Sequence, residues 1–251
     1  MGPSTYDEDA PIGIGPHPHI GLQTVTWLVA GEMLHRDSLG SEQKIEPGQL
    51  NLMTAGHGVS HAEENVHRHG DMHGIQLWVA QPERTRHDAP AFEHHAELPQ
   101  AEFGAATATV LVGGLGDVMS NARRDTDHFG AEILLRGDAT LPVDPTHEHA
   151  IVVLDGRVEV DDGSVEPGHL GYLDVGKEEL TLRSAEPTRL MLLGGVPFES
   201  KITMWWNYVA RDRDEIARAN VDWAEGHDRY GDTGSAWRRI PAPTPPWETP
   251  T

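Results

Sequence analysis

Two pairs of side chains in the first quarter of the chain have the residue types and the spacing of metal ligands. His17 and His19 stand two residues apart, as do His61 and Glu63. On an extended strand this spacing directs both side chains of a pair to one face. If the two strands are neighbours, three imidazoles and one carboxylate converge on one point. Such a set suits Fe, Mn, Ni, Cu or Zn, and a six-coordinate metal would keep two positions for water, substrate or dioxygen.

Histidine is frequent in this region, so either pair alone has a second interpretation as solvated or hydrogen-bonded side chains. The other histidines of the first half are His35, His57, His67, His69, His73, His87, His94 and His95. The presence of both pairs in one segment favours the metal site. A further pair, His147 and His149, has no partner pair downstream, and we expect it to lie in a surface loop without metal.

The elements that position these residues read as β-strands. Short apolar runs separated by Gly, Pro, Asp or Asn recur from Leu22 to Val196, which is typical of antiparallel strands joined by turns. One stretch differs, because Arg213–Trp223 has helical spacing behind the acidic Asp212. From Pro241 onward the chain is rich in proline and predicts a loose tail.

An internal repeat indicates two similar β-units. Its anchors are glycines, which pair as Gly31 with Gly156, Gly48 with Gly168 and Gly56 with Gly176. Each copy reads as a hairpin, a Pro-Gly turn and a strand. We therefore predict an all-β protein of two β-barrels, an N-terminal domain over residues 1–119 and a C-terminal domain over residues 120–251.

The second copy shows which half can bind metal. The positions that align with the four candidate ligands hold Pro142, Asp144, Thr181 and Arg183. No ligand set is preserved there. The metal site is therefore expected in residues 1–119 alone.

Composition excludes several classes of protein. The chain of 251 residues has 19 Lys and Arg against 40 Asp and Glu, a formal charge of −21, which argues against direct nucleic-acid binding through a basic surface. It has no apolar run of about 18 residues and no secretory signal, so we expect a cytoplasmic protein without a membrane span. Since it contains no cysteine, any metal must be held by nitrogen and oxygen.

The order of these motifs resembles that of the pirin family in the cupin superfamily. The segments that carry the resemblance are His17–Trp27, His35–Gly40, Met53–Gly56, His61–Glu63, Gly74–Val79, Gly194–Phe198 and Trp206–Val209. The resemblance implies two cupin barrels, a bicupin, with one metal in the N-terminal barrel. The family's ligands match His17, His19, His61 and Glu63. Fe(II) is the implied metal, with Mn, Ni, Co, Cu or Zn as alternatives.

The chain also departs from the family. Pirins generally have Arg, Phe, Glu and Arg at the positions of Ile20, Leu22, Gln23 and His57. Gln23 in place of Glu removes a charge near the site, which affects metal preference. Only 16 residues precede His17, fewer than in most members, so either the first barrel lacks an edge strand or the start lies further upstream.

The resemblance implies a metal-dependent dioxygenase like the quercetin 2,3-dioxygenases, acting on a flavonol-type aromatic substrate and dioxygen. Glu63 would accept the substrate proton. The alternative is a redox-sensitive co-regulator that acts through a protein partner and catalyses nothing; a cupin isomerase or storage role is a third interpretation. We expect a monomer. Trp78, Trp205 and Trp206 are expected to be packing residues.

Overall fold

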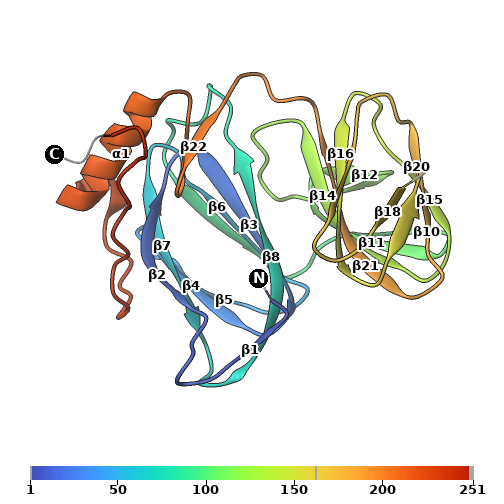
Figure 1. The fold of residues 1–251 in the computed structure, drawn as a ribbon, viewed down its shortest axis with the longest axis horizontal. Helices are drawn as coiled ribbons and strands as arrows, with labels where there is room; N and C mark the ends of the chain where they lie inside the picture. The colour runs from blue at the N-terminus through green and yellow to red at the C-terminus, as the bar shows by residue number, and fades with distance from the viewer. Residues whose placement is uncertain (1, 162, 249–251) are drawn as a thin grey trace. The chain divides into compact units, whose positions relative to one another are not determined.

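Strands are the dominant secondary structure of the computed structural model, which describes residues 2–161 and 163–248 (Figure 1). The chain divides into two units. Unit 1 contains the residues up to Ala96 together with those from Ser200 onward, and unit 2 runs from Glu97 to Glu199. This division differs from the expected boundary after residue 119. Residues 97–119 supply strands to the sheets of unit 2, and the end of the chain packs with unit 1. Among the described residues, no helix has the length and apolar character needed to cross a membrane.

Unit 1 is built from two antiparallel sheets in the strand orders β1-β8-β3-β6-β9 and β2-β7-β4-β5. The strands are β1 Ser4–Tyr6, β2 Ile14–His19, β3 Leu22–Ala30, β4 Met33–Asp37, β5 Glu42–Ile45, β6 Leu50–Thr54, β7 Val59–Asn65, β8 Gly70–Ala80 and β9 Ala91–His95. Leu28, Met33, Ile45 and Met72 pack together as one buried cluster between them. Burial of such side chains is the main stabilising contribution to the barrel.

Unit 2 repeats the two-sheet plan. Its larger sheet has the order β10-β11-β14-β21-β16-β19, its smaller one β15-β20-β17-β18, and β12 pairs with β13. The strands are β10 Gln100–Phe103, β11 Ala106–Val112, β12 Gly114–Leu115, β13 Val118–Met119, β14 His128–Leu135, β15 Ala139–Pro142, β16 Glu148–Asp155, β17 Val158–Val160, β18 Gly163–Val165, β19 Leu170–Leu173, β20 Glu179–Arg183 and β21 Thr188–Gly195. The expected all-β architecture of two barrels is confirmed.

The internal repeat is visible in the backbone. Gly48 and Gly168 both adopt a φ of +87°, and the amide after each glycine donates to the carbonyl three residues earlier at 3.1 Å. A left-handed residue at the third position is the hallmark of a type II turn, and it favours glycine. Gly31 and Gly156 also share a positive φ, at +88° and +80°. The glycine alignment therefore identifies equivalent turns.

The chain from residue 200 to 248, here called the C-terminal segment, carries a hairpin and the helix. It contains β22 Thr203–Trp205, β23 Tyr208–Ala210, α1 Arg213–Glu225 and the 3-10 turn η1 Asp228–Tyr230. The expected helix is confirmed. Its N-cap is Asp212, whose carboxylate accepts the Glu215 amide at 2.8 Å. Ile216, Ala219 and Trp223 form the buried face.

The C-terminal segment packs on the first barrel, near β2 and β7 (Figure 1). The Val209 amide donates to the Ile20 carbonyl at 3.1 Å, and the Ser60 hydroxyl donates to the Tyr230 carbonyl at 2.5 Å. The described part of the proline-rich tail is also held, since the Asn220 side chain donates to the carbonyl of Pro243 at 3.1 Å. This differs from the loose tail expected from Pro241; residues 249–251 lie outside the described residues.

Candidate metal centre

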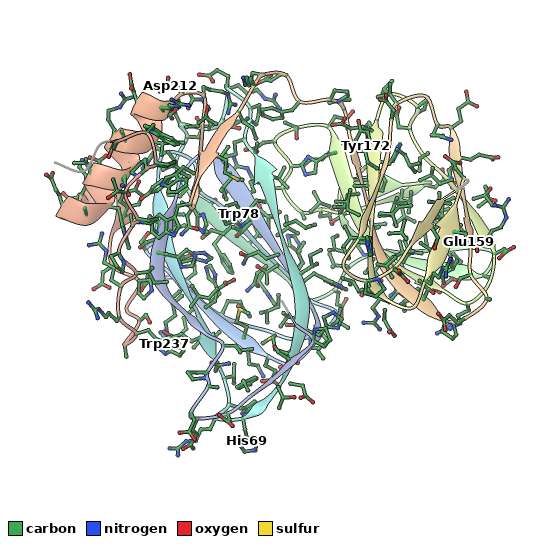
Figure 2. All side chains as sticks on the ribbon, in the orientation of Figure 1. His69, Trp78, Glu159, Tyr172, Asp212 and Trp237 are labelled. Carbon is green, nitrogen blue, oxygen red and sulfur yellow. The ribbon has the colours of Figure 1, made fainter. Side chains whose placement is uncertain are left out.

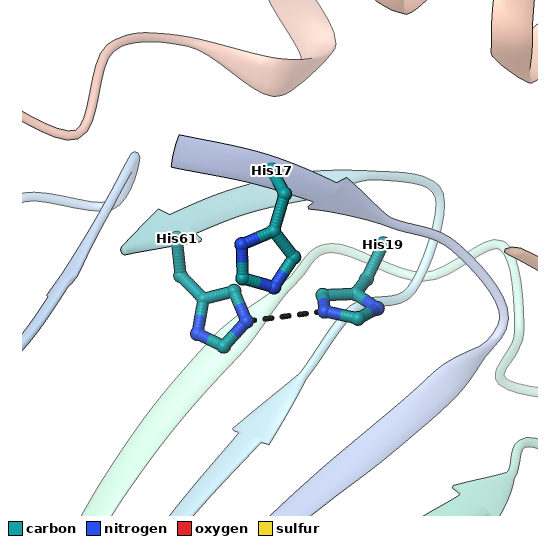
Figure 3. A group of neighbouring side chains, drawn as sticks. All are labelled: His17, His19 and His61. Atoms are coloured by element: carbon teal, nitrogen blue, oxygen red, sulfur yellow. Dashed lines mark hydrogen bonds between the residues drawn. The ribbon is translucent and has the colours of Figure 1, made fainter. Parts of the chain in front are cut away.

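Three of the four candidate ligands meet inside the first barrel. β2 and β7 are antiparallel neighbours with His17 opposite His61. One ring nitrogen from each of His17, His19 and His61 lies within 4.8 Å of the others, and all three side chains are buried. Figure 3 shows the rings facing one another from the two strands. The expected convergence of the two pairs is confirmed for these three residues.

The spacing of the inner nitrogens suits a shared ion. The Nε2 atoms of His19 and His61 are 3.1 Å apart, a hydrogen bond in this structure (Figure 3) that bonds to a shared ion would replace. Two metal–nitrogen bonds of about 2.1 Å separated by a near right angle would span about 3 Å. This pair therefore has the separation of adjacent ligands on a metal of octahedral type.

Local backbone features determine the direction of the His17 and His19 side chains on β2. The register between β2 and β7 shifts between Ile14 and His17, an irregularity of the kind that redirects side chains. Gly15 lies in this stretch, where a Cβ atom would stand 2.3 Å from the carbonyl oxygen of Arg238. Glycine therefore lets the C-terminal segment approach the strand that carries His17 and His19.

The outer nitrogens of the β2 pair are held by backbone carbonyls. Nδ1–H of His17 donates to the Gly15 carbonyl at 2.9 Å, and Nδ1–H of His19 donates to the Asn207 carbonyl at 3.0 Å. A carbonyl only accepts, so each ring carries its proton on Nδ1 and keeps a lone pair on Nε2. Outer-shell acceptors of this kind orient metal-binding histidines.

Burial keeps the three rings neutral. It lowers the pKa of His17 to about 4, partly offset by the hydrogen bond to Gly15. Burial likewise holds the pKa of His19 and His61 well below the usual range, and the neighbouring histidines lower it further. A metal binds only the neutral imidazole, so these rings are ready to coordinate at neutral pH.

Glu63 lies beside this group on β7, almost fully buried. Its Oε1 accepts the Gln76 amide Nε2–H at 2.5 Å, whereas Oε2 has no hydrogen-bond partner among the described residues. Burial raises the pKa of the carboxyl group. Glu63 is not part of the group within 4.8 Å, so its role as the fourth ligand stays a prediction. A buried carboxylate oxygen without a partner, beside three neutral imidazoles, fits a divalent transition metal.

Trp78 borders the site and is not simply a packing residue. Its side chain is 38 % exposed (labelled in Figure 2), and its ring meets that of His19 edge to face with centroids 5.2 Å apart. The indole Nε1–H points to Oε1 of Gln76 at 3.5 Å. Trp78 therefore presents an aromatic surface next to a candidate ligand, which differs from the packing role expected.

The histidine pair of unit 2 is buried, contrary to the surface loop expected. His147 and His149 are 6 % and 1 % exposed, because β16 carries His149 into the interior beside Phe129. Their ring nitrogens have no hydrogen-bond partner among the described residues, although Nε2 of His147 lies 3.7 Å from a carboxylate oxygen of Asp127. Within the part of the chain that the structure describes, only the first barrel gathers three ligands.

Several contributors to the site were not foreseen from the sequence. They are Gln76, which holds Glu63, Asn207, which holds His19, and His35 with Asp37, which lie behind His61. His35 and Asp37 carry a usable signal, since they show the same two-residue spacing as the ligand pairs. The backbone carbonyl of Asn207 carries none.

Comparisons with known proteins agree with this architecture. The family description "Pirin" matches residues 1–79, and "Pirin C-terminal cupin domain" matches residues 131–229. A Pseudomonas aeruginosa protein named "Putative quercetin 2,3-dioxygenase" is 42 % identical over 250 residues, covering 98 % of this chain and 79 % of its own length. A "Pirin-like protein" of Caulobacter vibrioides is 35 % identical, covering 92 % of this chain and 83 % of its own.

A solved structure extends the likeness to three dimensions. The crystal structure of quercetin 2,3-dioxygenase from Acinetobacter baumannii superposes with a TM-score of 0.94 at 38 % identity, covering all of this chain and 85 % of that one. The fold, the inward histidines and the sequence matches thus lead to one conclusion. The chain belongs to the pirin family.

Proposed function

We propose that this chain is a metal-dependent dioxygenase that acts on flavonol-type aromatic substrates. The observation that carries the proposal is the buried group of three neutral imidazoles beside a carboxyl group with one unpartnered oxygen. The names of the similar proteins from P. aeruginosa and A. baumannii support the reaction class. Fe(II) is the metal we propose first, because the resemblance to the pirin family implies it; the nitrogen and oxygen donors also suit Mn, Ni, Co, Cu or Zn.

His17, His19, His61 and Glu63 would hold the metal. When bound, the ion lowers the pKa of a substrate hydroxyl and supplies the redox chemistry with dioxygen. The protein contributes the rest: Gly15 and Asn207 keep two rings in the ligating tautomer, and burial keeps bulk water away from the site.

Glu63 is the residue we assign to proton transfer. A catalytic base works best when its pKa is close to the working pH, and burial raises the pKa of this carboxyl group in that direction. Gln76 holds one oxygen by a hydrogen bond, so Oε2 is the oxygen that would ligate the metal, and it would have to leave the metal to take the proton of a flavonol hydroxyl.

Trp78 is assigned to substrate binding. Its exposed ring beside His19 offers a flat apolar surface, which suits an aromatic substrate through offset or edge-to-face contacts. Trp78→Ala should raise KM for quercetin while leaving metal content unchanged, and Trp78→Phe should preserve most of the binding.

The decisive experiment loads the protein with Fe(II) without oxygen, adds quercetin and then air, and measures carbon monoxide release together with loss of flavonol absorbance. Glu63→Gln should abolish turnover, whereas His147→Ala, in unit 2, should leave it intact. Absence of turnover with each of iron, manganese, nickel, cobalt and copper, in protein that binds the metal, would overturn the enzymatic assignment. It would favour the co-regulator that binds a protein partner instead.

A further inference from the structure

His61 is held differently from the other two imidazoles. Where His17 and His19 donate to backbone carbonyls, Nδ1 of His61 faces Nδ1 of His35 at 3.4 Å. The far nitrogen of His35, Nε2, lies 3.0 Å from Oδ2 of Asp37. Carboxylate, imidazole and candidate ligand therefore form one buried chain, in which Asp37 and His61 have no exposure and His35 is 4 % exposed.

The protons along this chain can be assigned from Asp37. Burial raises the pKa of its carboxyl group, but hydrogen bonds from His35 and Ser41 outweigh burial and lower the pKa overall. Its other oxygen, Oδ1, accepts the amides of Leu39 at 2.9 Å and Ser41 at 3.0 Å. Ionised Asp37 only accepts, so His35 must carry a proton on Nε2, and the neutral imidazole then keeps its lone pair on Nδ1.

We propose that Asp37 and His35 are positioning residues that impose the ligating tautomer on His61. The bare Nδ1 of His35 accepts the Nδ1–H of His61, which leaves the lone pair of His61 Nε2 for the metal. The inference rests on the metal centre of the proposed function but not on the dioxygenase reaction.

Two further observations support this role. Phe92 stacks on His35 with ring centroids 4.3 Å apart and planes 13° apart, which holds the imidazole in the orientation the chain requires. In unit 2, the position that aligns with His35 through the Gly31 and Gly156 anchors is Val160, buried in an apolar core. The hydrogen-bonded series Asp37–His35–His61, here called the relay, is therefore present in the barrel that gathers ligands. In the other barrel the position of its central histidine holds an apolar side chain.

Asp37→Asn should reverse the donor and acceptor roles in the hydrogen bonds of the relay. The Leu39 and Ser41 amides would hold the new amide oxygen, so its N–H would face Nε2 of His35. His35 would then carry its proton on Nδ1, against the N–H of His61. A histidine forced into the wrong tautomer keeps its place but loses its function.

The test measures Zn²⁺ affinity in the full-length protein. Asp37→Asn should weaken zinc binding by about ten- to a hundredfold, the usual effect of losing an outer-shell partner. His35→Leu should weaken it too, and Asp37→Asn added to His35→Leu should change it little further, since the relay is already broken. Asp125→Asn is the matched control, a buried aspartate of unit 2 that accepts from Arg123 at 2.9 Å, and it should leave zinc affinity unchanged.

A measurement on the unaltered protein does not depend on any variant folding. In the zinc-loaded protein, ¹⁵N chemical shifts of the imidazoles should show His35 protonated on Nε2 alone. A proton on Nδ1 of His35, or on both nitrogens, would overturn the relay, as would an Asp37→Asn protein that binds zinc as tightly as the parent. Failure of the parent to bind zinc would overturn the metal centre and the relay together. A confirmed relay without carbon monoxide release would overturn only the proposed reaction.

Discussion

In the first barrel three imidazoles converge from β2 and β7, whereas the buried histidines among the described residues of unit 2 are His147 and His149. Two turns are equivalent in the two units, with matching φ values for Gly48 and Gly168 and similar values for Gly31 and Gly156. The difference lies around the rings. His17 and His19 each have a backbone carbonyl as acceptor for the outer N–H, and Nδ1 of His61 lies 3.4 Å from Nδ1 of His35, while His147 and His149 lack hydrogen-bond partners among the described residues. The two barrels therefore differ in the groups that orient their buried histidines, and the first barrel alone has the arrangement that we propose for metal binding.

The largest expected effect tests that contrast directly. His61→Ala should abolish stoichiometric metal binding, because it removes one of three converging ligands, whereas His147→Ala should leave metal content unchanged. Elemental analysis of both purified variants decides it. The metal-dependent rise in melting temperature should vanish in His61→Ala alone. Equal losses in the two variants would mean that the two barrels are not functionally different.

A second test compares equivalent glycines. A Cβ atom on Gly56 would lie 2.1 Å from the Asp88 carbonyl oxygen, whereas one on Gly176 would meet nothing within 4 Å. Both have positive φ, which costs an alanine about 1 kcal/mol. Gly56→Ala should therefore lower the free energy of unfolding by about 4 kcal/mol or more, and Gly176→Ala by about 1 kcal/mol. Similar urea midpoints for the two would contradict this expectation.

Acid should destabilise the first barrel through its histidines. His17 has a pKa of about 4 in the folded protein against 6.5 when unfolded. The unfolded state therefore binds more protons between these values, and the stability contributed by neutral His17 is lost as pH falls from 6.5 to 4, by about 3 kcal/mol. His17→Asn should flatten this part of the profile in metal-free protein. An unchanged slope would exclude His17 as its source.

Glu63 should show the opposite dependence. Burial raises its folded pKa, so in metal-free protein its stabilising contribution falls as pH rises from 4.5 through that pKa. Glu63→Gln should raise the melting temperature of the metal-free protein at pH 7, because a neutral amide avoids the cost of burying an ionised carboxylate. The same variant should bind metal more weakly. A variant less stable without metal would show that ionised Glu63 has a partner of its own.

The smallest effect should be identical in the two barrels. Gly48 and Gly168 share the same φ, and an added Cβ would meet nothing within 4 Å at either position. Alanine at each should cost only the left-handed strain, about 1 kcal/mol. Denaturant unfolding of the two variants should agree within about 0.5 kcal/mol. A clear difference would show that the turns, and not only the interiors, have diverged.

Sequence patterns predicted the parts of this protein that depend on local geometry. The two-residue spacing of His17 and His19 placed both rings on one face of a strand, and the acidic cap at Asp212 marked the helix start. Features that depend on contacts between segments distant in the sequence could not be predicted. Residues from 200 onward were assigned to the second domain, yet they pack on the first barrel, because the repeat says nothing about where they dock.

The burial of individual histidines and the contacts between them also could not be predicted from the sequence. The sequence favours a surface loop for His147 and His149 because no partner pair lies downstream, and the position of β16 in its sheet shows that they are interior. His35 and Asp37 had the same spacing as the ligand pairs, but the contact between His35 and His61 depends on β4 lying beside β7. Such pairing is a tertiary property that a single sequence does not reveal.

The hydrogen bond between His19 and Asn207 also orders events during synthesis. The two residues are 188 positions apart, so the ribosome adds that many residues after His19 before the carbonyl that holds this ring exists. At translation rates of about 5–20 residues per second this takes about 10 to 40 s. Throughout that interval the emerging first barrel lacks one of its orienting contacts. All the candidate ligands can therefore be oriented only after residue 207 has been added. A polypeptide whose synthesis stops before that residue lacks the acceptor for His19.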